Sequence, residues 1–592
     1  MSGRGSPPGR QNAPRVYIPS LKTAGAKTVR KTSPVNYDKE STVRFVPLGG
    51  LEEVGRNCSF FEYKDEIVII DVGIQFPEEE TPGIDYIIPN VTYLEPKKQN
   101  IHGLIFTHGH YDHVHALPYL LEKLGNPVIY TAAFTKAIIE KRCQEFPNLP
   151  KLNFHIVKNG DVVKLSPSFE AEFFDIGHTI PDALGIILNT PAGKMVHFGD
   201  FRLDVNLEGK PVNLEAFERI GAMGVHSIFV DSTNSLREGF SVSEKIVEEN
   251  LEKLIKHARG RVIIGSFASL ITRIIEIFKI AHRLGRKVAV NGRSMRDNVQ
   301  IAQQLGYLKV EKDQLLNLED VNKHPDNKLL ILTTGAQGES NSGLMRIVNG
   351  EHRVITLKPS DTVIFSSSVV PGNERSVQAL QDNISRQVEE IYNTKLLDIH
   401  TSGHAYSEDL KLVMQLTKPK YVVPVHAYYF MRKRVRTLAD EAGFDKNRVM
   451  LLDNGQVALM TSDSFIASDE KVPAFYVMVD GLGVGDVEEV VLRDRRNLAA
   501  EGMVVVIITL DRKNGRLLKN PDIISRGFIY LREHQDILDE IRKRLRGITT
   551  RLPNYQEVEP DYLKALIRDQ IGQFLYNKTK RRPMILPVVI EI

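Results

Sequence analysis

The sequence predicts an α/β protein made of a layered α/β domain, a parallel-sheet domain inserted into it and a small C-terminal α/β domain. Three observations support this fold class. Strand-like and helix-like runs alternate over residues 101–230, and a different α/β rhythm occupies residues 232–395. Histidines typical of a metal site occur on both sides of the second segment, at residues 108–113 and at His426, so the second segment is expected to interrupt the first domain.

The first domain is expected to begin near Val43, and its first part is expected to end at residue 231. Short apolar runs separated by turn residues predict strands, and the run that ends in Asp71 is typical of a buried strand. Strands are predicted over residues 43–47, 58–63, 66–71 and 101–106, and a helix over residues 116–123.

The inserted domain is expected over residues 232–395, where strands and helices alternate as in a parallel sheet. Helices are predicted over residues 246–258 and 271–284, and strands over residues 262–265, 287–290 and 363–366.

After the insertion, residues 396–462 are expected to return to the first domain. The charged segment 463–472 is interpreted as a linker, and residues 473–592 as a C-terminal domain with helices over residues 537–545 and 561–576.

Length and composition place the chain among multidomain globular proteins. Its 592 residues exceed a single core and suggest roughly three or four domains. Hydrophobic residues make up 42% and charged residues 26%, as in soluble proteins. No run of about 18 apolar residues and no apolar signal core occurs, so neither a membrane span nor secretion is expected. The two cysteines, Cys58 and Cys143, favour a reducing, cytoplasmic setting without disulfides.

Residues 1–42 form a basic segment with eight lysines and arginines against two acidic residues. Its net charge of +6 exceeds the +3 of the whole chain, so the remainder is negative. Because it is rich in Gly, Pro, Ser and basic residues, it is expected to be disordered. It can attract a polyanion or serve as a solubilising tail, and the sequence favours neither.

The densest cluster of functional residues is the HxHxDH run Thr107-His108-Gly109-His110-Tyr111-Asp112-His113. Side chains two residues apart on an extended chain point the same way, so His108 and His110 can face one point. Asp112 and His113 lie where the chain is expected to turn into a helix and can face a second point. Neutral imidazoles and carboxylates suit zinc or manganese, and a site without cysteine ligands suits catalysis better than a structural role.

Three further candidate ligands follow strand-like runs, where α/β folds place functional groups: His178, Asp200 and His426. Singly, each is more often an ordinary polar residue at a strand end, but together with the motif they supply two sites. The first would use His108, His110 and His178, the second would use Asp112, His113 and His426, and Asp200 would bridge them. Two Zn²⁺ or Mn²⁺ ions about 3.5–4 Å apart can hold a bridging hydroxide and clamp a phosphoryl group. Asp71 is expected to orient ligand histidines from outside the site.

These motifs resemble those of a known family. The HxHxDH run, His178, Gly199-Asp200-Phe201 and His426 match the metallo-β-lactamase fold, an αββα sandwich. Asp231-Ser232-Thr233 and His404 resemble the β-CASP nucleases, whose parallel α/β domain is inserted into that fold. Residues 43–592 look like bacterial ribonuclease J, and the stretch VDGLGVGDV at residues 479–487 discriminates most, since other β-CASP proteins lack it.

The resemblance implies a zinc- or manganese-dependent ribonuclease with 5′-to-3′ exonuclease and endonuclease activity in RNA maturation and decay. It implies single-stranded RNA as the substrate and a homodimer or homotetramer formed through the C-terminal domain. RNA-decay or ribosome-associated partners are also expected. Catalysis would involve Asp112, Asp200 and His404, with His404 protonating the leaving 3′ oxygen or stabilising the phosphorane. His400 is expected to support the site from outside.

Small residues near His404 suit a phosphate group. The loop Thr401-Ser402-Gly403 carries hydroxyls and backbone amides, and Ser366-Ser367-Ser368 follows a predicted strand. Either segment can hold a 5′-monophosphate, preferred in exonucleolytic decay, and ordinary turn chemistry is the alternative interpretation.

Several positions depart from the family pattern. Tyr111 is commonly Glu, His115 is usually Gly, Leu270 is usually polar, and Ala427-Tyr428 is usually Gly-Glu. All predicted ligands are present, so the departures concern rate, metal preference and substrate fit. His115 is interpreted as a helix-face residue in preference to a phosphate contact.

Three other functions are weighed against a ribonuclease. A β-CASP nuclease acting on DNA is disfavoured only by the C-terminal stretch. A non-catalytic RNA-binding scaffold is expected to have lost ligands, whereas every ligand position is filled here. A small-molecule hydrolase of the β-lactamase type would have no use for the inserted and C-terminal domains.

Overall fold

The computed structural model describes residues 37–77, 81–370, 372–481, 483–487, 489–529, 533–551 and 558–592. Residues 1–36 of the basic segment lie outside the described residues, and Thr42 at its end is already buried. The chain divides into two compact units. The larger one contains the described residues up to Gln75 and Ile88–Phe475, and the smaller one contains Phe76–Ile87 and Tyr476–Ile592.

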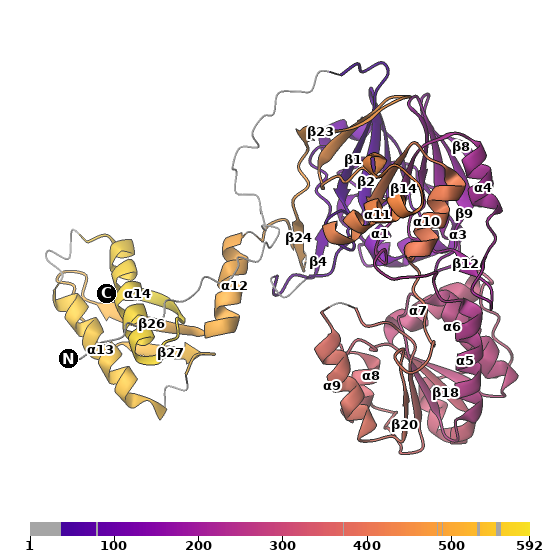
Figure 1. Cartoon of the computed structure of the whole chain (residues 1–592). Helices are drawn as coiled ribbons and strands as arrows, with labels where there is room; N and C mark the ends of the chain where they lie inside the picture. Colours follow the sequence, from indigo (N-terminus) through magenta and orange to yellow (C-terminus); the bar gives the residue numbers. More distant parts are fainter. Residues whose placement is uncertain are drawn as a thin grey trace, which may run out of the picture. The chain divides into compact units, whose positions relative to one another are not determined.

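Two β-sheets packed face to face form a sandwich in the larger unit (Figure 1). One has the order β23-β22-β1-β2-β3-β5-β6-β7 and the other β21-β14-β11-β10-β9-β8. The strands of the first sheet are β1 (Val43–Gly49), β2 (Cys58–Tyr63), β3 (Glu66–Ile70), β5 (Ile101–Ile105), β6 (Ile129–Thr131), β7 (Phe154–Ile156), β22 (Gln456–Met460) and β23 (Phe465–Lys471). Those of the second are β8 (Val162–Lys164), β9 (Glu170–Asp175), β10 (Leu184–Thr190), β11 (Gly193–His197), β14 (Val225–Asp231) and β21 (Tyr421–Val425).

Apolar side chains fill the space between the two sheets. Phe45 and Phe61 of the first sheet meet Phe229 of the second, with ring centroids 4.5 and 5.5 Å apart respectively. On the outer face of the second sheet, a separate core packs under three helices: α4 (Glu215–Ala222), α10 (Ser407–Thr417) and α11 (Tyr429–Glu441). The layered fold expected for the first domain is therefore present.

The inserted segment forms a parallel sheet with the order β17-β16-β18-β15-β19-β20. Its strands are β15 (Val262–Gly265), β16 (Lys287–Asn291), β17 (Leu315–Leu316), β18 (Leu329–Thr333), β19 (Thr362–Phe365) and β20 (Glu390–Tyr392). Its main helices are α5 (Glu244–His257), α6 (Ile271–Arg283), α7 (Arg293–Gln304), α8 (Gly343–Val348) and α9 (Glu374–Ser385). Figure 1 shows α5 and α6 on one face of this sheet and α8 and α9 on the other. The predicted helices and strands of this domain agree with the structure to within two residues at each end.

The expected linker at residues 463–472 is wrong, because β23 occupies most of it. This strand pairs antiparallel with β22, and Ser468 Oγ donates a hydrogen bond to the Val457 carbonyl oxygen at 2.8 Å. Phe465 and Ser468 are buried, whereas most of the charged side chains point to solvent. Strands at the edge of a sheet commonly carry charged side chains, so the sequence of β23 resembles that of a linker.

The single helix predicted over residues 116–123 is also corrected. The chain instead forms two one-turn helices, α1 (Tyr111–Val114) and α2 (Leu117–Leu120). Pro118 lies in the first turn of α2, where its missing N–H costs no hydrogen bond. Helix α1 therefore begins inside the histidine motif and contains Asp112 and His113.

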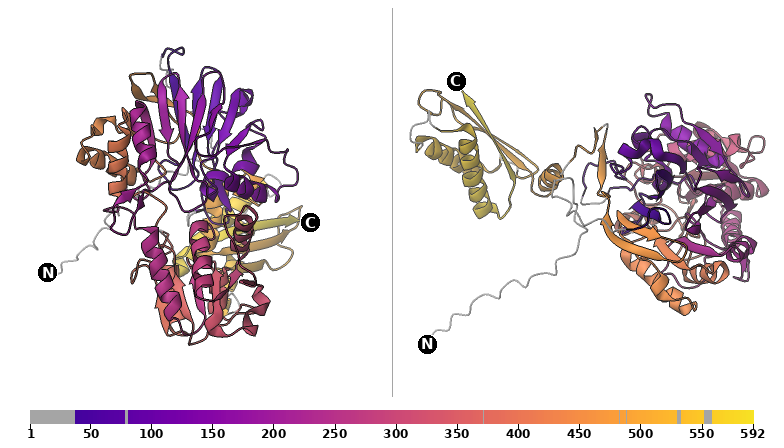
Figure 2. Two further views of the ribbon diagram at one scale, coloured as in Figure 1. Left: turned by 90° about the vertical axis from the view of Figure 1, so that its right-hand side faces the viewer. Right: turned by 90° about the horizontal axis from the view of Figure 1, so that it is seen from above.

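The smaller unit contains a three-stranded sheet, β27-β26-β28, with α13 and α14 packed against one face (Figure 2). A second sheet, β25-β24-β4, includes residues that the sequence analysis placed in the first domain. Ile84 and Ile87 pack there with Met478 and Leu492, so segment 76–87 belongs to this unit. The elements are β4 (Tyr86–Ile88), β24 (Val477–Asp480), β25 (Gly483–Val484), α12 (Glu489–Glu501), β26 (Met503–Leu510), β27 (Asp522–Arg526), α13 (Gln535–Thr550), α14 (Pro560–Thr579) and β28 (Met584–Glu591). Across the described parts of both units, no helix combines the length and the apolar character needed to span a bilayer.

A buried ion pair connects β15 and β19 in the inserted sheet. Arg261 Nε and Nη2 donate to the two carboxylate oxygens of Asp361 at 2.8 and 2.7 Å, and both side chains are at most 1% exposed. Asp361→Leu leaves a buried guanidinium unpaired, which is expected to cost about 3–5 kcal/mol. Amide hydrogen exchange of β15 and β19 should therefore accelerate. In the double variant Arg261→Met/Asp361→Leu most of the protection should return, and equal exchange in the single variant and wild type would contradict the prediction.

Candidate metal centre

The candidate ligands meet at one edge of the sandwich because each follows the end of a strand. His108 and His110 lie after β5, and the one-turn helix α1 carries Asp112 and His113. The remaining three, His178, Asp200 and His426, follow β9, β11 and β21 of the second sheet. Both sheets therefore contribute to a single centre.

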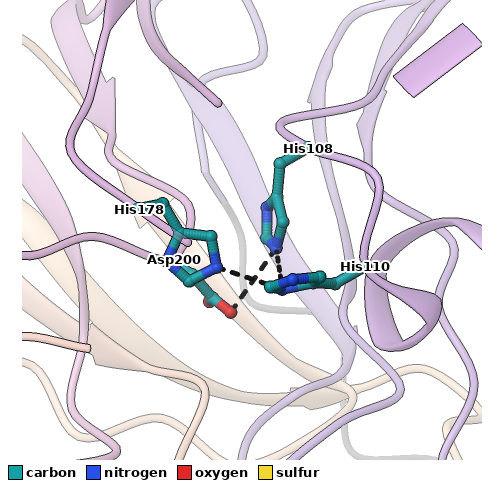
Figure 3. Close-up of side chains that lie close together, drawn as sticks. All are labelled: His108, His110, His178 and Asp200. Atoms are coloured by element: carbon teal, nitrogen blue, oxygen red, sulfur yellow. Dashed lines mark hydrogen bonds and ion pairs between the residues drawn. The ribbon is translucent and has the colours of Figure 1, made fainter. Parts of the chain in front are cut away.

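The first group contains His108, His110, His178 and Asp200, with all potential ligand atoms within 4.8 Å of one another (Figure 3). Nδ1 of His110 lies 3.1 Å from Nε2 of His108 and 3.0 Å from Nε2 of His178. Oδ2 of Asp200 lies 3.6 Å from Nε2 of His108. The three histidines assigned to the first site from the sequence are thus brought together.

The second group contains Asp112, His113, His426 and again Asp200. Nε2 of His113 lies 3.2 Å from Oδ2 of Asp200, and Nε2 of His426 lies 3.0 Å from Oδ2 of Asp112. Asp200 is 2% exposed and belongs to both groups. This is the position expected of a bridging carboxylate.

The donor set fits divalent cations. Nδ1 of His178 lies 2.8 Å from the Gly403 carbonyl oxygen, so it carries the proton and Nε2 points a lone pair at the other histidines. Burial and neighbouring histidines lower the pKa of His108 and His178 well below the usual range, and burial lowers the pKa of His110 to about 4. Neutral imidazoles such as those of the first group, and carboxylates, are ligands that zinc and manganese accept. In the second group, burial lowers the pKa of His113, but the carboxylates of Asp200, Asp112 and Asp71 raise it to about 10, so a cation there would take the place of a proton.

Asp71 lies behind the second group. Its Oδ2 is 2.8 Å from Nδ1 of His113 and also accepts a hydrogen bond from Thr107 Oγ1 at 2.9 Å, while Oδ1 accepts one from the Thr107 amide. The predicted orienting contact is therefore made to one histidine. Asp71 and His426 have φ values of 59° and 54°, a region that non-glycine residues rarely adopt. Such conformations are typical of functional sites.

His404 forms a third group with Asp200, Asp231 and His426, whose ligand atoms lie within 4.8 Å of one another. Asp231, the last residue of β14, holds the His404 ring. Nδ1 of His404 is 2.7 Å from Oδ2 of Asp231 and 3.8 Å from Oδ2 of Asp200. Burial lowers the pKa of His404, but these two carboxylates raise it more, so it stands above its usual value. From the sequence, no role is expected of Asp231 beyond its place in the stretch Asp231-Ser232-Thr233, which resembles the β-CASP nucleases. Its place at the end of a buried strand, like that of Asp71, was the available signal.

A network of charged side chains missed by the sequence analysis fixes the loop before His404. Arg202 donates to Thr401 Oγ1 at 3.3 Å, and Arg273 donates to the Ile399 carbonyl oxygen at 3.1 Å. Both guanidinium groups also bind Glu244, at 2.9 and 2.5 Å. The two arginines share the single carboxylate of Glu244, so together they keep an excess of positive charge next to this loop.

Two of the residues expected to bind substrate, Thr401 and Ser366, are hydrogen-bonded within this frame. Thr401 is 1% exposed, and Ser366 is fully buried with its hydroxyl donated to the Ile399 carbonyl oxygen at 2.7 Å. A Cβ on Gly403 would lie 2.5 Å from the His178 ring, so this glycine permits close packing. Ser367 is also buried. Ser402 remains partly exposed beside His404.

His115 is a buried imidazole, and His400 is partly buried. Burial, followed by the charges of three nearby arginines, lowers the pKa of His400 to about 3, and within the described residues it has no hydrogen bond to a candidate ligand. Its expected support of the site is therefore indirect. His115 stacks on Tyr111 with ring centroids 3.4 Å apart, and burial lowers its pKa to about 3. Its packing favours the helix-face interpretation over a phosphate contact.

Family models cover most of the chain. They match residues 51–238 as "Metallo-beta-lactamase superfamily", residues 259–384 as "Ribonuclease J, beta-CASP domain", residues 392–450 as "Zn-dependent metallo-hydrolase RNA specificity domain" and residues 490–592 as "Ribonuclease J C-terminal domain". Ribonuclease J 1 of Streptococcus pyogenes is 38% identical over 93% of this chain and 98% of its own length. The chain belongs to the ribonuclease J family. Ribonuclease J2 of Bacillus subtilis is 34% identical over 93% of this chain and 99% of its own length.

Membership in the ribonuclease J family, together with the His/Asp cluster, makes this chain a metal-dependent ribonuclease that acts on RNA with a divalent metal. A crystal structure of a protein of unknown function from Enterococcus faecalis shares the fold, with a TM-score of 0.53 at 15% identity. It matches 71% of this chain and all of that protein.

Proposed function

We propose that this chain hydrolyses single-stranded RNA with two Zn²⁺ or Mn²⁺ ions, one in each ligand group, as a 5′-to-3′ exonuclease and an endonuclease. The observation that carries the two-ion proposal is Asp200, whose carboxylate belongs to both groups. When bound, two such ions supply a hydroxide at neutral pH and neutralise charge on the phosphoryl group. The cytoplasm, with RNA-decay or ribosome-associated partners, is the proposed setting, and the free Cys58 and Cys143 are consistent with it.

His404 is proposed to transfer a proton to the leaving 3′ oxygen. Because Asp231 occupies Nδ1 of the ring, Nε2 is the nitrogen that remains for the substrate. The carboxylates of Asp231 and Asp200 raise the pKa of His404 and so favour the protonated ring. His404 also keeps 23% of its side chain exposed, unlike the ligand His108, and can therefore reach RNA.

Digestion of one RNA labelled at either end tests this function. With 5′-labelled RNA an exonuclease releases the labelled mononucleotide at once, whereas endonucleolytic cuts give labelled fragments of intermediate length from both RNAs. A chelator should stop both reactions, and added Zn²⁺ or Mn²⁺ should restore them. Cleavage that persists after chelation would contradict the metal mechanism, and faster cleavage of DNA of the same sequence would favour the DNA nuclease.

The RNA 5′ end is expected to be sensed near Ser402. The partly exposed Ser402 lies next to His404, and the excess charge of Arg202 and Arg273 lies behind this loop. A site made of one hydroxyl and small neighbouring residues is proposed to suit a monophosphate and to crowd a triphosphate. Exonucleolytic decay of 5′-monophosphate RNA should therefore be about tenfold faster, the effect of one hydrogen bond to a charged group. Equal rates on the two RNAs, measured by release of the 5′ nucleotide, would contradict this pocket.

The sheet of the smaller unit supports a homodimer or homotetramer. The face opposite α13 and α14 is also apolar, and Ile524, Leu586, Val588 and Ile590 are 39–43% exposed on it. The pairing of β26 with β27 and β28 places Ile524 and Leu586 on either side of Val505 and places Val588 beside Ile507. A contiguous exposed apolar surface of this kind is typical of a protein interface.

The variant Leu586→Glu/Val588→Glu should therefore lower the oligomeric state, because two carboxylates would be buried without partners in the interface. Light scattering coupled to size-exclusion chromatography measures the mass. Tyr562→Glu, at a 60% exposed site on α14, is the matched control and should leave the mass unchanged. An unchanged mass for the double variant would exclude this face as the interface.

A further inference from the structure

Three consecutive aromatic residues, Tyr428, Tyr429 and Phe430, follow the candidate ligand His426 at the start of α11. Tyr429 is 49% and Phe430 57% exposed. Exposed hydrophobic residues normally occur singly on a protein surface. Two large neighbouring rings exposed beside the metal centre therefore either bind a partner or lower the solubility of the protein.

The aromatic cluster, defined as Tyr428, Tyr429 and Phe430, is close to the centre and firmly held. Successive Cα atoms are about 3.8 Å apart, so the Cα of Tyr428 lies within about 8 Å of that of His426. The Met431 carbonyl oxygen accepts a hydrogen bond from Ser235 Oγ at 2.8 Å. Arg432 is fully buried and donates to the Ala427 carbonyl oxygen at 3.2 Å and to the Leu452 carbonyl oxygen.

The rings are arranged for flat ligands. The planes of Tyr428 and Phe430 are within 14° of each other, with centroids 6.2 Å apart. The Arg432 guanidinium lies 5.5 Å from the centroid of the Tyr429 ring. The Arg432 guanidinium is buried and supports the ring from below, and aligned rings at a surface are typical of sites on which nucleic-acid bases stack.

The charges on the first turns of α11 itself favour a polyanion, and the nearby carboxylates of Glu52 and Asp453 act on the buried Arg432. No acidic residue occurs from Ala427 to Val435. Lys433 is exposed and forms no ion pair with any described residue. The neighbouring Arg434 pairs with Glu441 at 3.1 Å. A phosphate next to a stacked base can therefore approach this surface without meeting a negative side chain on α11's first turns.

We propose that the aromatic cluster is a stacking platform for bases of the RNA that crosses the metal centre. The proposal rests on the proposed ribonuclease function and adds the residues that hold the strand. Every base offers a π-face, so stacking binds RNA without sequence preference. That property suits an enzyme that degrades many RNAs, whereas a protein partner would not require aligned rings flanked by positive charge.

The absence of tryptophan from the chain allows a direct test. Phe430→Trp introduces one fluorophore into the platform, and Tyr562→Trp introduces one at a 60% exposed site on α14 as the control. Both proteins are titrated with a single-stranded oligoribonucleotide in the presence of a chelator, and binding is followed independently by anisotropy of the labelled RNA. The Phe430→Trp emission should be quenched saturably, an abasic oligonucleotide of equal length should quench it much less, and the control should not respond. Binding without quenching of Phe430→Trp would overturn the proposal.

Steady-state kinetics provide the second measurement. Tyr429→Ala and Phe430→Ala should each raise KM for RNA about tenfold with kcat nearly unchanged, because one stacked base is lost. Tyr429→Phe and Phe430→Tyr keep a ring and should retain the wild-type KM. An unchanged KM in both alanine variants overturns the platform, and so does a loss of self-association in light scattering, which would make the cluster a protein interface. If wild-type protein with metal fails to cleave RNA, the proposed function fails instead, independently of the fluorescence result.

Discussion

Asp112→Ala is expected to abolish RNA cleavage while RNA binding is nearly retained. Asp112 supplies a carboxylate to the second ligand group, with Oδ2 3.0 Å from Nε2 of His426. Without it, a cation held by the second group would lose an anionic ligand and would supply less hydroxide near pH 7. Metal content measured by mass spectrometry should fall from about two ions per chain towards one. His110→Ala should have the same effect through the first group.

RNA binding should persist because the phosphate contacts proposed near Ser402 and the aromatic cluster lie outside both ligand groups. Fluorescence anisotropy of a labelled RNA measures this. Asp463→Ala is the matched control, because its side chain is 89% exposed and, among the described residues, its carboxylate contacts only Lys420 at 3.6 Å and Ser462 Oγ at 3.0 Å. Full activity of Asp112→Ala would exclude the proposed mechanism.

His404→Ala is expected to keep both ions yet lose most turnover. Neither of the two groups assigned to the ions contains His404, and its Nδ1 contacts Asp231 at 2.7 Å. Its removal should therefore take away a proton donor and leave the assigned ligands in place. General acid–base assistance is typically worth about 10²–10⁴-fold in rate. Single-turnover cleavage of end-labelled RNA, together with metal analysis, measures both parts of the prediction.

His257→Ala provides the comparison for His404, because His257 is exposed on α5 and bonds only to the Lys253 carbonyl oxygen among the described contacts. It should cleave RNA at the wild-type rate. A rate for His404→Ala within a few-fold of wild type would remove His404 from catalysis. Loss of one ion in this variant would instead make His404 a ligand.

The sequence by itself determined the fold class, the inserted sheet and the candidate ligands. These features are local: a strand or helix is encoded by periodicity within a few residues, and HxHxDH spacing places two imidazoles on one side of an extended chain. His178, Asp200 and His426 could be predicted because each follows a buried apolar run. The same rule applied to β14 would have found Asp231.

Only the tertiary structure decided which distant residues meet. Glu244 joins Arg202 and Arg273, and Asp231 holds His404 from 173 residues away along the chain. Segment 76–87 pairs with β24 through backbone groups, which every sequence contains alike. The charged strand β23 pairs with β22 at the edge of a sheet, and the sequence of β23 alone does not predict this pairing. The side-chain contacts depend on chain topology, and the strand pairings depend on backbone hydrogen bonds. Neither leaves a local pattern in the sequence.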